Sequence, residues 1–501
     1  MLLKLVVAYL VVSIGIGLFA AAKVHNARDY ITAGRHLPMS VVLAMVFATW
    51  FGSETVLGNS GTFLKDGVSG LISDPLGAGL CLMLFGLLFA RPLYRMNLLT
   101  LGDFFRRRYN RSIELALSLC IVISYLGWVG AQITALGLVF DLLSGGTINQ
   151  TTGMMIGAAV VLLYTLLGGM WSVAVTTFVQ MIVIVLGLLY VTWIANDMAG
   201  GIGTVMGHAI DAGKFDLVSG TSWRDVFTWV AALFTMALGS IPQQDVFQRV
   251  NSSGNERIAV RGTTLGGLSY IVFALVPIYL AYTAQIIDPE MVATVSADDT
   301  QKIMPMLVMT HMSFVTQVIF FGALLSVIMS TASGTLLAPS VTFSENILRG
   351  FIPEMTDRQF LWASRITVVV FTLLVTWYAV NSNATIHEMV EHAYRITLAG
   401  AFVPLVTGIF WKRANDLGGT LSVCFGLSVW LGCELLLRLD AIPEMLEPQI
   451  YGLIASALGM LLGVAFGAKA ATEMHPDSNT NTSSDMNLDT DPPPEGIEST
   501  T

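Results

Sequence analysis

Charged side chains are scarce in this sequence. Lys, Arg, Asp and Glu make up 12% of its 501 residues, whereas a soluble domain carries about 25%. Apolar residues make up 54%, and the mean hydropathy is +0.71. This composition excludes an ordinary soluble domain, and the chain has no basic stripe of the kind that indicates a nucleic-acid partner. The sequence therefore predicts an all-α polytopic membrane protein embedded in a lipid bilayer.

Cysteine is also rare, and its positions exclude a disulfide framework or a cysteine metal site. All four cysteines lie inside apolar runs, which predicts buried thiols; they are Cys81, Cys120, Cys424 and Cys433. The histidines lack ligand spacing, and no nucleophile–base pair or metal set is evident. We therefore expect no enzymatic activity and no bound cofactor.

Basic residues are absent from the C-terminal tail, residues 471–501. Seven acids account for its charge, so that the net charge of −9 becomes −2 without it; they are Glu473, Asp477, Asp485, Asp489, Asp491, Glu495 and Glu498. The tail is rich in Ser, Thr, Asn, Asp and Pro, a composition that cannot form a core. We predict two parts: a membrane domain at 1–470 and a disordered acidic cytoplasmic tail at 471–501.

Long apolar runs dominate the rest of the chain. About 20 apolar residues cross a bilayer, and by this rule we predict thirteen transmembrane helices: 3–22, 39–64, 68–91, 112–143, 151–170, 174–196, 225–248, 261–287, 314–346, 360–381, 386–411, 418–437 and 449–469. The first run has an alternative as a signal peptide, because Ala20-Ala21-Ala22 resembles a cleavage site. Its apolar stretch is long and only Lys4 precedes it, which favours a span.

Lys and Arg are divided unequally between alternate loops. Cytoplasmic loops of membrane proteins are enriched in these residues. The loops on one side of the membrane hold 18 Lys and Arg residues, and the loops on the opposite side hold 5. The larger set is Lys23, Arg28, Arg35, Arg91, Arg95, Arg106, Arg107, Arg108, Arg111, Arg249, Arg257, Arg261, Arg349, Arg358, Arg365, Lys412, Arg413 and Lys469. We therefore place the N-terminus outside the cell and the C-terminus in the cytoplasm, across the cell membrane.

Two apolar runs are interrupted by glycine, hydroxyls and an acid. The interruptions are 48–54 (Ala-Thr-Trp-Phe-Gly-Ser-Glu) and 238–245 (Leu-Gly-Ser-Ile-Pro-Gln-Gln-Asp). Irregular backbone survives at membrane depth only where it lines a site. Gly52 and Gly239 are five spans apart, which indicates an inverted repeat of spans two to six and seven to eleven, with spans one, twelve and thirteen added. Unwound backbone is expected near 50–53 and 239–242.

The ninth span is dense in hydroxyls: Ser326, Ser330, Thr331, Ser333 and Thr335. Such residues serve helix packing and bonding to carbonyls of the same helix. They also suit an alkali-cation site, because a hard cation takes oxygen ligands from hydroxyls and from the carbonyls of a broken helix. The pattern alone leaves both interpretations open.

Three segments together resemble the sodium/solute symporter family. The segment 165–173 (Thr-Leu-Leu-Gly-Gly-Met-Trp-Ser-Val) is similar to its Gly-Gly signature, 327–332 (Val-Ile-Met-Ser-Thr-Ala) to its sodium-site segment, and 408–413 (Gly-Ile-Phe-Trp-Lys-Arg) to the end of its eleventh span. The resemblance covers about residues 5–470. It implies a LeuT-type five-helix inverted repeat, sodium-coupled solute uptake, and sodium ligands at Ala48, Phe51, Val327, Ser330 and Thr331.

Within this family the motifs are nearest to choline-type members, which cage a quaternary ammonium with tryptophans. Trp50 and Trp128 match two cage positions, whereas the residue after Pro242 is Gln243 and not tryptophan. We therefore expect choline to be a poor substrate. The acids in the interrupted spans favour a cationic or zwitterionic solute. The expected solute-site residues are Trp50, Ser53, Glu54, Asp74, Trp128, Gln243 and Gln244.

Two further features refine the prediction. Glu388/His392 and Glu391/Arg395 are spaced as helical ion pairs, and a proton relay is the alternative. In the choline-type pattern an acid stands where this chain has Thr177. A second sodium site resting on that acid is therefore not expected, and we predict one sodium per solute.

These features predict a sodium-coupled symporter that imports a small polar organic solute by alternating access. The alternative is a transporter-like membrane sensor without an output domain of its own. A channel is a third possibility, but two broken helices around an occluded midplane favour alternating access.

Overall fold

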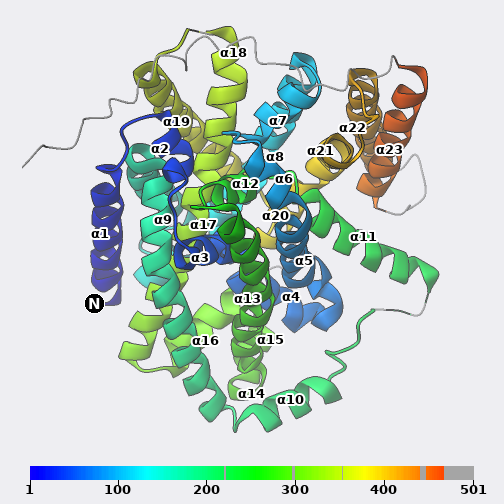
Figure 1. The fold of residues 1–501 in the computed structure, drawn as a ribbon. Helices are drawn as coiled ribbons and strands as arrows, with labels where there is room; N and C mark the ends of the chain where they lie inside the picture. The colour runs from blue at the N-terminus through cyan, green and yellow to red at the C-terminus, as the bar shows by residue number, and fades with distance from the viewer. Residues whose placement is uncertain (219, 221, 296–298, 353, 440–446, 468–501) are drawn as a thin grey trace, which may run out of the picture.

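The computed structural model describes residues 1–467 except 219, 221, 296–298, 353 and 440–446. Within this part of the chain every regular element is helical, and one isolated bridge joins Leu37 to Ser253. The predicted all-α class is confirmed (Figure 1). The predicted tail at 471–501 lies outside the described residues.

The first half of the chain runs through ten helices and five short 3₁₀ or π turns. The helices are α1 (Leu2–Ala21), α2 (Ala27–Thr32), α3 (Met39–Trp50), α4 (Asn59–Asp66), α5 (Ala78–Leu84), α6 (Ala90–Arg95), α7 (Leu101–Arg108), α8 (Arg111–Ser144), α9 (Gln150–Met198) and α10 (Ile202–Asp211). The turns are η1 (Ala33–Arg35), η2 (Glu54–Gly58), η3 (Gly67–Leu71), η4 (Ile72–Gly77) and η5 (Phe85–Phe89).

The second half, as far as the structure describes it, continues in the same way. Its helices are α11 (Trp223–Gly239), α12 (Gln244–Asn251), α13 (Glu256–Tyr282), α14 (Ala284–Ile287), α15 (Pro289–Thr294), α16 (Ile303–His311), α17 (Phe314–Thr342), α18 (Arg349–Phe351), α19 (Asp357–Asn381), α20 (Ile386–Thr397), α21 (Val403–Phe410), α22 (Asp416–Arg438) and α23 (Pro448–Phe466). The turns are η6 (Thr300–Lys302), η7 (Phe343–Leu348) and η8 (Leu398–Phe402).

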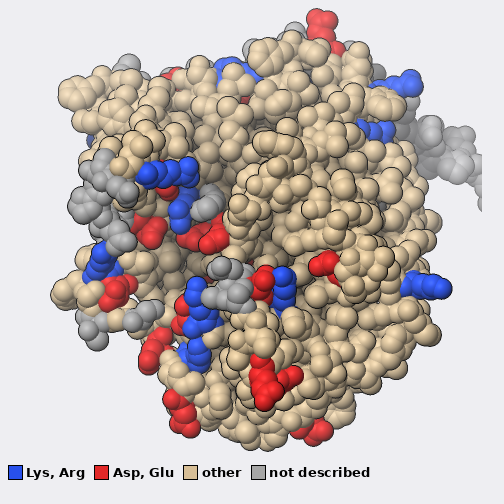
Figure 2. Space-filling view, turned by 180° about the vertical axis from the view of Figure 1, so that it is seen from behind, with Lys and Arg blue, Asp and Glu red and all other residues tan. Residues whose placement is uncertain are grey.

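Many of these helices are long and apolar enough to cross a membrane. Among the described residues ten qualify, or eleven when the bent pair α11 and α12 is taken as one span, and Met39–Trp50 and Gln150–Leu163 are shorter apolar helices. Large apolar side chains are exposed on them, including Leu186 and Trp193 at 65% each. Figure 2 shows broad uncharged areas on one face. Such a surface is stable against lipid, so the chain is an integral membrane protein.

The 49-residue element α9 consists of two helices that meet at Gly169, where φ is +48° and ψ is −140°. A side chain would be strained at this φ, and a Cβ there would also lie 2.4 Å from the Tyr30 carbonyl oxygen. Near its start α9 packs on the end of α8, with Gly153 against Gly137; near its end Gly187 packs on Ala323 of α17. The glycine thus allows the turn between the predicted fifth and sixth spans.

Helix α17 forms the centre of the molecule (Figure 1). The Ser313 side chain caps its first turn by accepting from the Thr316 N–H. From Ala323 to Thr342 every residue of α17 is buried, including all its hydroxyls. It packs on α8, α9, α3 and α12, so that the polar face of the predicted ninth span is turned toward both broken helices.

The remaining helices cover the ends and sides of this centre. Figure 1 shows α10, α14, α15 and α16 gathered at one end, with α7 and α18 at the other. Helices α22 and α23 pack together as a pair at one side, and α1 packs on α9 at another.

One residue used in the loop-charge argument was wrongly placed. Arg249 lies in α12 with 0% exposure, not in a loop. Its guanidinium donates to the Met45 carbonyl oxygen at 2.5 Å and to Thr49 Oγ1 at 2.9 Å. Backbone and hydroxyl acceptors on α3 hold this arginine inside, and sequence alone does not reveal such partners. Removing it leaves 17 basic residues against 5, so the asymmetry persists.

Candidate functional site

The first broken helix is α3 with its continuation η2 and α4. Helix α3 ends at Trp50, and Phe51 leaves the helical conformation with φ −72° and ψ 70°. The Ser53 N–H donates to Gln132 Oε1 of α8 at 3.0 Å. A Cβ on Gly52 would lie 3.0 Å from Gln132 and from Thr331, so the chain passes closely between α8 and α17. The predicted break is confirmed, and Gln132 holds its backbone in place.

The second broken helix is α11 with α12. Helix α11 ends at Gly239, α12 begins at Gln244, and their axes differ by 46°. The Thr397 hydroxyl of α20 donates to the Gly239 carbonyl oxygen at 2.6 Å. This predicted break is also confirmed. A side chain from a neighbouring helix satisfies its free carbonyl, as the termini of interrupted helices require.

The five expected sodium ligands lie where α3 ends against α17. Thr331 Oγ1 lies 3.2 Å from the Ala48 carbonyl oxygen and 3.3 Å from the Phe51 carbonyl oxygen. A threonine hydroxyl has one hydrogen, so one hydrogen faces two acceptors. The hydroxyl of Ser330, the residue before Thr331, donates to the Val327 carbonyl oxygen at 2.9 Å. All five are fully buried.

An aromatic cluster, which we define as Trp50, Trp128 and Tyr394, borders the same break. The ring centroids of Trp50 and Trp128 are 6.1 Å apart, and Tyr394 lies 6.5 Å from the first and 5.6 Å from the second. Tyr125 stacks on Trp128 at 5.9 Å with an interplanar angle of 8°. The indole N–H of Trp50 and the hydroxyl of Tyr394 are buried and have no hydrogen-bond partner among the described residues.

The two glutamines after Pro242 face different neighbours. Gln243 Nε2 donates to Ser124 Oγ at 3.2 Å and to Thr397 Oγ1 at 3.4 Å, within the region between α8 and α20. Gln244 Oε1 accepts from the Leu101 N–H at 2.9 Å, at the start of α7. The structure therefore brings Gln243 toward the interior where the aromatic cluster lies, whereas Gln244 holds the neighbouring helix α7.

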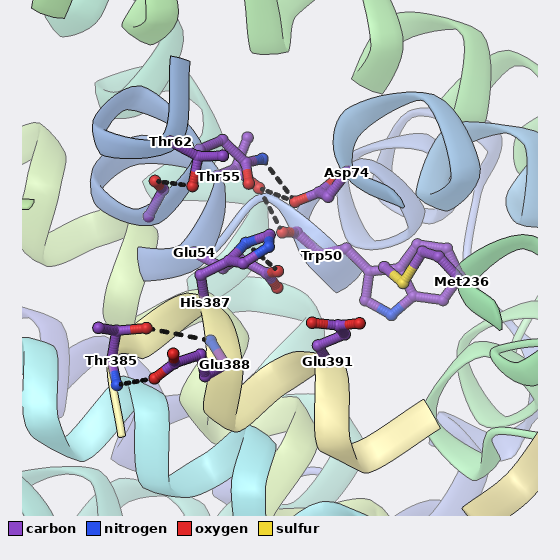
Figure 3. A network of polar contacts seen from close by, with 12 residues as sticks. Trp50, Glu54, Thr55, Thr62, Asp74, Met236, Thr385, His387, Glu388 and Glu391 are labelled. Atoms are coloured by element: carbon purple, nitrogen blue, oxygen red, sulfur yellow. Dashed lines mark hydrogen bonds and ion pairs between the residues drawn. The ribbon is translucent and has the colours of Figure 1, made fainter. Parts of the chain in front are cut away.

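Glu54 begins η2 directly after the break and faces His387 of α20, with 3.4 Å between Oε1 and Nδ1 (Figure 3). A cavity of about 10 Å³ lies between Glu54, Ser73, Thr235, Met236, Glu391, Tyr394 and Ala232. A larger cleft of about 290 Å³ opens beyond His387 and is lined by Gly58, Thr62, Lys65, Asp66, Gly70, Thr300, Gln301, Thr385 and Glu388. Glu54 lines the small cavity and His387 lines the larger cleft, so this pair stands between the two.

Asp74 lies on the other side of the same break, in η4, and is 0% exposed. Its carboxylate accepts from Asn59 Nδ2 at 2.7 Å, from Thr55 Oγ1 at 3.4 Å and from the Tyr270 hydroxyl. Asp74 lines neither of the two cavities described above. Ser53 turns away from them as well, donating to the Ala131 carbonyl oxygen at 3.5 Å.

Several neighbours of the site were not anticipated. Gln132 sits on an apolar stretch whose composition does not distinguish it from core, whereas His387 and Tyr394 lie in the charged stretch 386–395, where only pairs within the helix were considered. The available signal was a polar residue at helical spacing from a predicted site residue, as Gln132 stands four residues after Trp128.

The remaining polar predictions have mixed outcomes. Arg395 pairs with Glu391 at 3.1 Å as predicted, and also approaches Glu434 at 3.5 Å. Glu388 instead caps α20 through the Thr385 N–H at 2.8 Å. The side chain of His392 lies outside the described part.

The hydroxyl of Thr177 is buried without a hydrogen-bond partner among the described residues. The described residues also contain no cluster of His, Cys, Asp and Glu suited to a metal ion.

Comparison with known proteins identifies the family. The model of the sodium:solute symporter family matches residues 30–426, most of the chain. The chain belongs to the sodium:solute symporter family. The symporter is 26% identical over 448 residues to the human high affinity choline transporter 1, covering 85% of this chain and 75% of that protein. It is 25% identical over 482 residues to the osmoregulated proline transporter OpuE of Bacillus subtilis, covering 90% and 93%.

Solved structures show the same fold. The symporter superposes on a substrate-bound, outward-open Na⁺-coupled sialic acid symporter with a TM-score of 0.78 at 18% identity, covering 94% of this chain and 99% of that one. A nucleobase-cation-symport-1 family transporter in a closed conformation gives a TM-score of 0.58 at 14% identity, covering 88% and 94%.

Proposed function

We propose that this symporter imports a small polar organic solute by coupling it to sodium entry through alternating access. One observation carries the proposal: the carbonyl oxygens of Ala48 and Phe51, freed where α3 ends, lie 3.2 and 3.3 Å from the hydroxyl of Thr331 on the central helix. Family membership and the fold support it.

The oxygens around Thr331 suit an alkali cation. A single hydroxyl hydrogen cannot serve both carbonyls, so at least one oxygen is left without a donor. Carbonyls at the C-terminal end of a half-helix carry partial negative charge and attract cations. We propose that Ala48, Phe51, Val327, Ser330 and Thr331 bind sodium, with Ser330 turning its hydroxyl away from Val327 when the ion arrives. This set contains no carboxylate, so no fixed negative charge holds the sodium ion when the site opens to the cytoplasm.

The arrangement of helices supports the finer topology proposed from the sequence. Among the described residues, the ten long apolar helices, the bent pair of α11 and α12, and the shorter apolar helices Met39–Trp50 and Gln150–Leu163 support a topology of thirteen spans, which we propose. Both broken helices meet α17 or α20 at the centre. We propose that spans two to six and seven to eleven are inverted repeats that rock against each other around this point.

We propose that the solute binds between the aromatic cluster and Glu54. Tyr394 belongs to the cluster and lines the small cavity together with Glu54 and Glu391. Indole faces attract cations, and two carboxylates near them favour a cationic or zwitterionic solute. Gln243 stands at the position of the third cage tryptophan and is hydrogen-bonded, so choline should bind poorly.

The cellular setting follows from the same proposal. The transporter lies in the cell membrane as a multi-pass protein, with its N-terminus outside and its C-terminus in the cytoplasm, as the loop charges favour. Its partners are the solute, sodium and lipid; nucleic acid plays no part. It requires no organic cofactor and catalyses no chemical reaction.

The proposed coupling is energetically sufficient. One sodium ion moving through 100 mV releases about 2.3 kcal/mol, and a tenfold sodium gradient adds about 1.4 kcal/mol. Together they support an accumulation of about 500-fold for each sodium ion, because 1.4 kcal/mol corresponds to a factor of ten.

Two linked experiments test this function. The purified protein is first screened by thermal unfolding against amines, amino acids, sugars and carboxylates, each with sodium and with potassium. A transported solute should raise the unfolding temperature more in sodium than in potassium, because the ion and the solute stabilise the same state. Solutes that pass are then tested in proteoliposomes for uptake driven by an inward sodium gradient.

Counterflow in the same proteoliposomes separates transport from sensing. A symporter exchanges internal for external labelled solute, whereas a sensor binds it without exchange. Sodium-stimulated binding without counterflow would contradict the proposal. Conductance in single-channel recordings would contradict alternating access.

A further inference from the structure

Asp74 is a buried carboxylate whose hydrogen-bond partners are all neutral. Its hydrogen-bond donors are the Tyr270 hydroxyl, Asn59 Nδ2 at 2.7 Å and Thr55 Oγ1 at 3.4 Å. The described contacts include no ion pair to Asp74, and its side chain is 0% exposed. A charge taken from water into such a place is strongly disfavoured without a compensating cation.

The oxygens around Asp74 outnumber the hydrogens between them. Thr55 Oγ1 lies 2.8 Å from the Trp50 carbonyl oxygen, 2.9 Å from the Tyr270 hydroxyl and 3.4 Å from Asp74 Oδ2. The Tyr270 hydroxyl also contacts Asp74 Oδ1. These four contacts share two hydroxyl hydrogens. When the Asp74 carboxylate is ionised, two of the four contacts therefore bring oxygen against oxygen with no hydrogen between them, an arrangement that a cation relieves.

A second, independent feature points to the same place. Asn59 is 0% exposed, and its amide group is directed at Asp74 through Nδ2. Its Oδ1 is buried and has no hydrogen-bond partner among the described residues. An unpaired buried amide oxygen is costly. Rotating the side-chain amide by half a turn would present this oxygen to the space beside Asp74.

We propose that this cluster is a second sodium site. Its ligands are the Asp74 carboxylate, the hydroxyls of Thr55 and Tyr270, the Trp50 carbonyl oxygen and Asn59 Oδ1. An all-oxygen set suits a hard cation, and its single carboxylate balances one positive charge, whereas calcium sites bring several carboxylates. The inference rests on the proposed sodium-coupled function and revises the expectation of one sodium per solute.

The two sites lie on opposite sides of one break. The carbonyls of Ala48 and Phe51 turn toward Thr331 on α17. The intervening Trp50 carbonyl turns toward Thr55, on the side of α13 and η4. Thr177 occupies the position at which the choline-type pattern has an acid, so no acid is available there. Asp74 supplies an acid on the other side of the break.

The second site is joined to both the solute region and the cavity. Trp50 places its carbonyl beside Thr55 and its indole in the aromatic cluster, so an ion at the carbonyl fixes the orientation of the ring. Ser73 and Glu54, the chain neighbours of Asp74 and Thr55, line the small cavity, so this cavity lies close to the proposed site.

Sodium alone is the probe, because the solute need not be known. Equilibrium binding of radioactive sodium is measured on the purified full-length protein in potassium-free, choline-free buffer, at several sodium concentrations and at two pH values. The wild type should bind about two sodium ions per chain. Asp74→Asn, which keeps the size of the side chain and removes its charge, should bind about one.

Matched variants separate the site from a folding defect. Thr55→Val keeps Asp74 and removes one ligand, and it should also lower the number to about one, or weaken the second ion at least tenfold. Thr177→Val removes a buried hydroxyl outside both sites and should keep two. Ser330→Ala/Thr331→Ala should lose the other ion and retain the one at Asp74. Unfolding temperature and gel-filtration profile confirm that each variant is folded.

Each outcome decides the inference. If Asp74→Asn and Thr55→Val are folded and still bind the wild-type number of ions, the site at Asp74 is wrong. If Asp74→Asn changes the pH dependence of sodium binding but not the number bound, the cluster holds a proton and the inference is overturned. A wild type that binds no sodium would instead contradict the proposed sodium coupling itself.

Discussion

The two broken helices differ in how their free oxygens are satisfied. At the second break, neighbouring helices pair the freed backbone groups closely: Thr397 donates to the Gly239 carbonyl oxygen at 2.6 Å, much nearer than the Tyr394 carbonyl oxygen at 3.2 Å, and the Asp245 N–H donates to the Tyr125 hydroxyl at 2.9 Å. At the first break, carbonyl, hydroxyl and carboxylate oxygens crowd together around too few hydrogens.

This difference indicates a division of labour. Oxygens without donors attract cations, so the first break is suited to holding ions. The second break is closed by hydrogen bonds to α8 and α20, so it does not need a cation to satisfy its oxygens. It is suited instead to transmitting movement between the helices that it joins. Two similar interruptions of membrane helices therefore have different roles, depending on how many hydrogen-bond donors the neighbouring helices supply.

The largest effect is expected from removing both hydroxyls on the α17 side of the first break. Ser330→Ala/Thr331→Ala should lower sodium-driven uptake by about 100-fold, because losing even an outer-shell partner of an ion costs about 10- to 100-fold in affinity. Initial uptake rates across a range of sodium concentrations measure this loss. Full sodium dependence in the double variant would show that the ion binds elsewhere.

A smaller effect is expected from opening the aromatic cluster. Trp50→Ala should weaken the apparent affinity for a cationic solute by about 30-fold, since a desolvated cation–π contact contributes about 2 kcal/mol. The backbone carbonyl of residue 50 remains, so the number of sodium ions bound should not change. Solute affinity in the purified protein measures the effect, and a wild-type value would remove Trp50 from the solute site.

The breaks themselves were visible in the sequence because glycine, proline and acids are conspicuous within apolar runs. The sodium ligands proposed near Trp50 and in the ninth span followed from the family resemblance. Gln132 and Tyr270 were missed, since a single polar residue in a long span has the same local pattern whether it packs or binds, and His387 was missed because only ion pairs within its own helix were considered. Only the fold determines that Tyr270 meets Asp74, which lies 196 residues away. The buried position of Arg249 was hidden for the same reason.

A modest effect is expected at the second break. Thr397→Val removes the donor to the Gly239 carbonyl oxygen, and leaving a buried acceptor unpaired costs about 1–3 kcal/mol. The unfolding temperature should fall and uptake should slow by a few-fold, while sodium affinity is unchanged. Parallel thermal unfolding and uptake measurements check this. A loss of sodium affinity equal to that of the α17 variants would erase the distinction between the breaks.

The smallest effect is expected at Thr177. Its hydroxyl is buried and has no hydrogen-bond partner among the described residues, so Thr177→Val removes an unsatisfied group and should leave stability equal or slightly higher. Sodium-driven uptake should stay within about twofold of the wild type. A marked loss of sodium dependence would show that the ion contacts this helix.

The most direct test of the account compares one isosteric change at each break. Thr331→Val and Thr397→Val each replace a buried hydroxyl by a methyl group, and sodium binding to the purified proteins is measured by equilibrium binding without solute. We predict that Thr331→Val loses one sodium ion per chain and that Thr397→Val retains the wild-type number and affinity. Equal sodium binding by the two variants would contradict the assignment of ion binding to the first break.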